Sequence, residues 1–85
     1  MDYGMIGKIE KAKIYAEERA DRIQFETFQV RIDGDNHAHV VTYDHGQWTC
    51  DCSFFATRNV CTHTMTMERV LQNMVQMGEP THQAA

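Results

Sequence analysis

All three cysteines of this 85-residue chain lie close together, and a histidine follows the last of them. The pattern is Cys50-x-Cys52, eight residues, then Cys61-x-His63. Thiolate and imidazole are the ligands that zinc takes in closed tetrahedral sites, and three cysteines with one histidine complete such a site. Ordinary buried cysteines beside a surface histidine are the alternative, but they do not account for the clustering. We predict one structural Zn²⁺ per chain, held by these four residues.

The spacing also predicts how the ligands are presented. Residues two apart on a strand face the same side, so Cys50 and Cys52 should point together from a strand end. Residues two apart on a helix do not face each other, so Cys61 should precede the helix that carries His63. The predicted site therefore joins the end of a sheet to the start of a helix.

The residues around the ligands have predicted places of their own. Positions 53–60 are expected to form a loop in which Phe54 and Phe55 cover the metal. Asn59 accepts the left-handed conformation that would turn the chain back. Trp48 alternates with the first two ligands along the strand, which favours packing beside the metal over a role as a stacking platform for a base.

The periodicity of the whole chain predicts an α+β fold. Apolar residues at spacings of three and four over 5–23 indicate a surface helix that lies on the rest of the protein. From Phe25 the period becomes two, which is typical of strands. After Cys61 the helical period returns and is expected to continue to the breakers Gly78 and Pro80. The predicted antiparallel meander has strands at 25–32, 37–43 and 47–50, with turns at 33–36 and 44–46.

We predict a single domain over residues 1–85. Its parts are the N-terminal helix and first strand (1–36), a zinc-binding unit with the C-terminal helix (37–78) and a frayed tail (79–85). A chain of this length buries only about 60–65% of its unfolded surface, so a metal would add needed stability.

The expected compartment follows from three absences. No apolar run approaches the length that spans a bilayer, so no membrane partner is expected. The first residues, MDYGMIGKIEKAK, lack the features of a secretory signal. The odd, tightly spaced cysteines do not resemble a disulfide framework, and reduced thiols persist in the cytosol. We therefore predict a cytoplasmic protein.

The ligand pattern in its context resembles a known family. C-x-C, a short loop and C-x-H, preceded by a strand and followed by an apolar helix, are similar to the SWIM-type zinc finger, and the resemblance covers about residues 37–72. It implies a β-hairpin and helix organised on zinc, with Cys50, Cys52, Cys61 and His63 as ligands. It further implies a module that binds nucleic acid or protein, often attached to larger chains such as chromatin remodellers, transposases and recombination-associated proteins.

The net charge and the side-chain content help to choose among the candidate functions. The formal net charge of −4 argues against a broad phosphate-binding surface, so a non-enzymatic module for a protein partner is predicted, with DNA binding as the alternative. A thiol-based redox switch or enzyme ranks last, because no nucleophile and base pair exists beyond the ligands. A homodimer is compatible with the small size. Cations available to a phosphate backbone are scattered along the sequence, among them Lys8, Lys11, Lys13, Arg31, Arg58 and Arg69.

Two further groups have alternative interpretations. His37 and His39 share a strand face, and two exposed strand histidines are favoured over a second metal site. The methionines in and near the last helix could form an adaptable binding face, but their helical period favours burial against the sheet. This group comprises Met65, Met67, Met74 and Met77.

Overall fold

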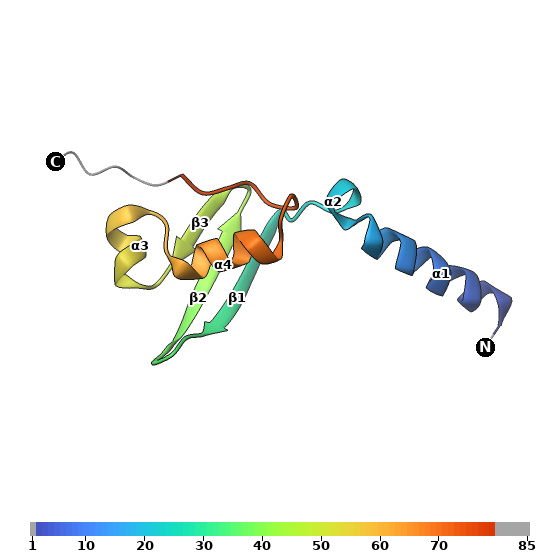
Figure 1. The fold of residues 1–85 in the computed structure, drawn as a ribbon, viewed down its shortest axis with the longest axis horizontal. Helices are drawn as coiled ribbons and strands as arrows, with labels where there is room; N and C mark the ends of the chain where they lie inside the picture. Colours follow the sequence, from blue (N-terminus) through green and yellow to red (C-terminus); the bar gives the residue numbers. More distant parts are fainter. Residues whose placement is uncertain (1, 80–85) are drawn as a thin grey trace.

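The structure, a computed structural model, describes residues 2–79 and has the predicted α+β fold (Figure 1). An N-terminal helical region is followed by a three-stranded antiparallel sheet and then by two further helices. In chain order the elements are α1 (Tyr3–Glu17), α2 (Arg19–Arg22), β1 (Thr27–Asp33), β2 (Ala38–Asp44), β3 (Gln47–Cys50), α3 (Ser53–Arg58) and α4 (Thr62–Val70).

The sheet is the predicted meander, with strand order β1-β2-β3. Val41 at its centre pairs with Val30 on one side and with Cys50 on the other. His45 and Gly46 join β2 to β3 with φ angles of 47° and 96°. Positive φ at both central residues is the geometry that suits the twist of a two-residue hairpin. This turn sets the register that brings Cys50 to the end of the sheet.

The core lies between the sheet and α4, which packs against β2 and β3. Val41, Tyr43 and Trp48 are three of its buried members from the sheet. The rings of Tyr43 and Trp48 meet edge to face at 4.7 Å, a favourable aromatic arrangement. Cys50 and Cys61 belong to the same buried cluster, so the ligand-bearing positions are part of the core.

The C-terminal helix is shorter than the sequence predicts. It ends at Val70, which is 64% exposed, rather than continuing to Gly78. Asn73 takes a φ of 68°, and the chain beyond it runs back so that Gly78 lies beside the Trp48 ring. The Trp48 indole N–H donates to the Gln76 carbonyl at 2.9 Å, and the Gln76 N–H donates to the Tyr43 hydroxyl at 2.9 Å. These tertiary hydrogen bonds hold the backbone of Gln76 outside the helix that the spacing of apolar residues predicts.

The predicted N-terminal helix is also divided and differently placed. The predicted N-terminal helix forms, with one interruption at Glu18 between α1 and the four-residue α2. No residue of α1 is buried, and the helix projects away from the sheet instead of lying on it (Figure 1). Within α1 the apolar stripe begins with Ile6 and Ile9 and continues with the smaller Ala12 and Ala16, so the half of the helix that leads to the sheet has little apolar area to bury against it.

None of the helices within residues 2–79 is long and apolar enough to cross a membrane. Except for Glu79, the predicted tail (79–85) lies outside the described residues, as does the predicted helix stop at Pro80.

Candidate metal centre

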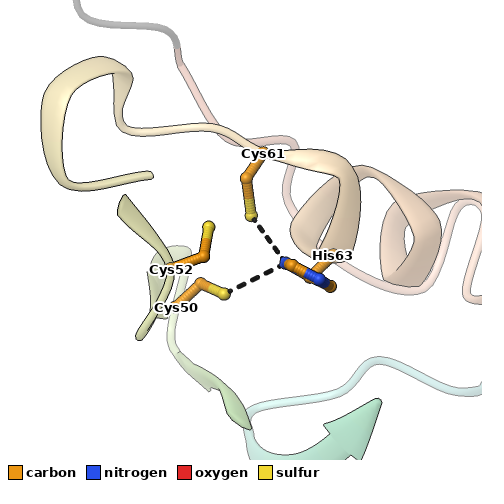
Figure 2. A group of neighbouring side chains, drawn as sticks. All are labelled: Cys50, Cys52, Cys61 and His63. Carbon is orange, nitrogen blue, oxygen red and sulfur yellow. Dashed lines mark hydrogen bonds between the residues drawn. The ribbon is translucent and has the colours of Figure 1, made fainter. Parts of the chain in front are cut away.

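The structure brings the four predicted ligand residues together (Figure 2). Cys50 is the last residue of β3, Cys52 immediately precedes α3, and Cys61 immediately precedes α4. His63 lies in the first turn of α4. Their three sulfur atoms and one imidazole nitrogen all lie within 4.8 Å of one another, close enough to hold one metal ion.

Two of the thiols are oriented by the helices that they cap. The Cys52 sulfur accepts the Phe55 N–H at 3.4 Å, and the Cys61 sulfur accepts the Thr64 N–H at 3.5 Å. The Thr64 hydroxyl oxygen in turn accepts the Cys61 N–H at 3.1 Å, which completes a reciprocal capping box. The prediction that Cys61 precedes its helix is confirmed. Free helix N–H groups favour negative charge, so these positions suit thiolates.

The imidazole of His63 presents one particular nitrogen to the sulfurs. Its Nδ1 lies 3.5 Å from the Cys50 sulfur and 3.6 Å from the Cys61 sulfur (Figure 2). The other nitrogen, Nε2, is on the side of Gly34, where an added Cβ would lie 3.9 Å from it. His63 therefore faces the candidate centre through Nδ1.

The thiols differ in their tendency to ionise. Burial raises the pKa of the Cys50 thiol to about 12. Burial acts in the same direction on Cys52, but the Phe55 N–H and hydrogen bonds with the Cys61 and Cys50 thiols together hold the pKa of Cys52 below its usual value. Neighbouring thiolates repel one another, so a cation is what would let all three carry negative charge at once.

The segment between the two ligand pairs is a helix and not the expected loop. α3 covers Ser53–Arg58, because the Cys52 thiol supplies an N-terminal cap. Phe55 packs on the core, whereas Phe54 is 48% exposed and carries the Arg58 guanidinium over its ring. That both rings cover the metal stays a prediction. Asn59 has a φ of 64° and turns the chain as predicted.

A histidine near the centre was misjudged from the sequence. His37 is exposed, as the favoured interpretation expected, but it precedes β2 instead of lying on the strand, and His39 is half-buried. The His39 ring lies 4.4 Å from the His63 ring, centroid to centroid, and its Nδ1 is 2.8 Å from an Asp51 carboxylate oxygen. The sequence feature that could have revealed this contact is Asp51, an acidic residue placed between two ligand cysteines. Within residues 2–79, the Cys50, Cys52, Cys61 and His63 group is the only cluster able to hold a metal.

No family model, curated protein or solved structure matches this chain.

Proposed function

We propose that the chain is a zinc-stabilised, non-enzymatic interaction module that binds a protein partner. The fit of the candidate centre to zinc supports the first part of this proposal, that the module is stabilised by zinc. Zinc bonds of about 2.3 Å to sulfur and 2.0–2.1 Å to nitrogen, at tetrahedral angles, put sulfur and nitrogen roughly 3.6 Å apart. The two distances from His63 Nδ1 to sulfur are 3.5 and 3.6 Å. The donor set of three thiolates and one imidazole also suits zinc.

The proposed zinc has a structural role. Three cysteines and one histidine fill a tetrahedral ion, and no position is left for a water molecule or substrate. The ligands come from β3, the start of α3 and the start of α4, so one ion ties the sheet to both helices. Such an ion contributes apparent folding free energy on the order of 10–16 kcal/mol, comparable with the whole stability of a small domain.

The SWIM-type zinc finger remains our proposed family. The spacing of the ligands supports it, and so does their context, since the β2–β3 hairpin precedes the first cysteine pair and α4 follows from the second. If this chain associates with larger assemblies, that would agree with the family's use as a module attached to larger chains.

A protein partner is supported by the apolar surface that the fold leaves uncovered. Along α1, Met5, Ile6 and Ile14 are each about half exposed, and Tyr3 is 93% exposed. A lone helix of 15 residues is marginal in water unless one face packs against something. Near α4, Met65 and Met77 are 44% and 68% exposed, so half of the predicted methionine core lies on the surface. These two methionines border a hollow of about 570 Å³.

Nucleic acid is the second candidate, and the charges oppose it. Lys13, Arg22 and Arg31 are paired with carboxylates at 3.6, 2.6 and 3.3 Å. Zinc bound to three thiolates would add one more negative formal charge to a chain already at −4. A weak affinity for DNA that changes little with salt is therefore expected, because few phosphates would be neutralised.

Two measurements test the proposal. Metal analysis of the purified protein should give one zinc per chain. Affinity capture with the zinc-loaded chain should then enrich a protein that an Ile6→Glu, Ile9→Glu variant of α1 fails to enrich, while Lys8→Glu, with a change of charge but not of apolar area, serves as the control. Tight binding to labelled duplex DNA at physiological salt, with a steep salt dependence, would instead favour the nucleic-acid function.

A further inference from the structure

Asp51 lies between the first two candidate ligands and ties them to the neighbouring strand. The β2–β3 ladder ends with the pair Val41 and Cys50, so Val40 has no partner residue on β3. Both carboxylate oxygens of Asp51 accept the Val40 N–H, each at 3.3 Å. The side chain thus continues the ladder by one position and fixes the backbone between the two cysteines.

The same carboxylate holds the ring of His39. One Asp51 oxygen is 2.8 Å from His39 Nδ1. An ionised carboxylate only accepts hydrogen bonds, so at neutral pH the proton of this contact is on His39 Nδ1. The side chain of His39 is 26% exposed, and its ring plane is set by this bond. His39 is thereby a fixed element beside the candidate centre.

His39 in turn lies against the imidazole of His63. The two ring centroids are 4.4 Å apart and the planes are tilted by 38°. A histidine can present either Nδ1 or Nε2 to a metal, and the choice depends on what holds the ring. Here the His63 ring has its Nδ1 edge toward the sulfurs and its face toward His39.

We propose that His39 is a positioning residue for the metal centre: anchored by Asp51, its ring holds the His63 imidazole so that Nδ1 faces the three sulfurs. This inference rests on the proposed zinc site and adds two residues to it. Neither His39 nor Asp51 binds the metal in this arrangement. Residues that orient a metal ligand through a hydrogen bond typically change metal affinity by about 10–100-fold when they are removed, and we expect the ring contact of His39 to act within that range.

The test compares three variants of the full chain in their affinity for Zn²⁺ alone, measured by competition with a chromophoric chelator. His39→Ala removes the ring and should weaken binding about 10–100-fold. His39→Phe keeps an aromatic ring beside His63 without the bond to Asp51, and should recover part of the loss, because the ring contact is kept while its anchor is removed. His37→Ala, two positions earlier and exposed, is the matched control and should bind as the wild type does.

A spectroscopic readout separates positioning from general stability. Imidazole ¹H–¹⁵N correlation spectra of the zinc-loaded wild type should identify His63 as bound through Nδ1 with a proton on Nε2. The His39→Ala protein should give a second set of His63 signals, whereas His39→Phe should not. Circular dichroism identifies any variant that has simply lost its fold.

The outcomes are distinguishable. If His39→Ala matches His37→Ala in both affinity and spectrum, the positioning role is overturned while the zinc site stands. Equal losses in His39→Ala and His39→Phe would also overturn it, because ring contact would then not be what matters. A wild-type protein that binds no zinc refutes the proposed function itself, and this inference falls with it.

Discussion

Replacing Cys61 with serine should separate its two roles, as a helix cap and as a metal ligand. Cys61 is 1% exposed, its sulfur caps α4, and it lies 3.6 Å from His63 Nδ1. Serine is a good N-terminal cap, so Cys61→Ser should lose the metal bond but keep the cap of α4. Alanine removes the cap as well, so zinc-loaded Cys61→Ala should be about 0.5–2 kcal/mol less stable than zinc-loaded Cys61→Ser.

The zinc-loaded variants should show the second role of Cys61, as a metal ligand. If four ligands share an apparent contribution of about 10–16 kcal/mol, one thiolate accounts for roughly 2.5–4 kcal/mol, or two to three orders of magnitude in Kd. Both variants should lose that amount relative to the zinc-loaded wild type. Urea unfolding of the zinc-loaded proteins measures this loss, followed by the fluorescence of the buried Trp48. A Cys61→Ser protein stabilised by zinc as much as the wild type would refute the assignment of this thiolate.

Three other predictions concern protonation, the hairpin and α1. Because burial raises the pKa of the Cys50 thiol to about 12, metal binding at neutral pH must displace its proton. Zinc affinity should therefore rise with pH, about tenfold per unit for each proton released. Calorimetry in buffers of different ionisation enthalpy counts the protons, and a pH-independent affinity would contradict the account. Gly46→Ala forces a side chain to a φ of 96° and should cost about 1–2 kcal/mol in urea unfolding; no loss would mean that the turn relaxes. Ile9→Lys on exposed α1 should change stability by less than about 0.5 kcal/mol, against about 2 kcal/mol for Val41→Ala in the core; a comparable loss from Ile9→Lys would show that α1 packs on the body.

The sequence was most informative where chemistry and short-range pattern agree. Alternation of apolar residues predicts the meander, because side chains of a strand point to opposite faces at a fixed period. Ligand types and spacing predict the cluster, since two extended residues and the start of a helix are enough to gather Cys50, Cys52, Cys61 and His63. The left-handed Asn59 also follows from local preference.

Features set by distant contacts were not predictable from those patterns. α4 stops at Val70 because Tyr43 and Trp48 bind the backbone of Gln76, more than 25 positions away in sequence. The contact of His39 with His63 requires α4 to lie across β2, which no local period encodes. α1 has a helical pattern in the sequence, yet the pattern does not say whether a partner face exists within the same chain.

The central claim is that one zinc ion holds the sheet and the C-terminal helices together. Native mass spectrometry of the purified protein, before and after a strong chelator and with circular dichroism alongside, tests it most directly. The account predicts one zinc per chain, and loss of structure around Trp48 when the metal is removed. A protein that carries no metal and remains folded would contradict it, and the three cysteines would then be packing residues of the core.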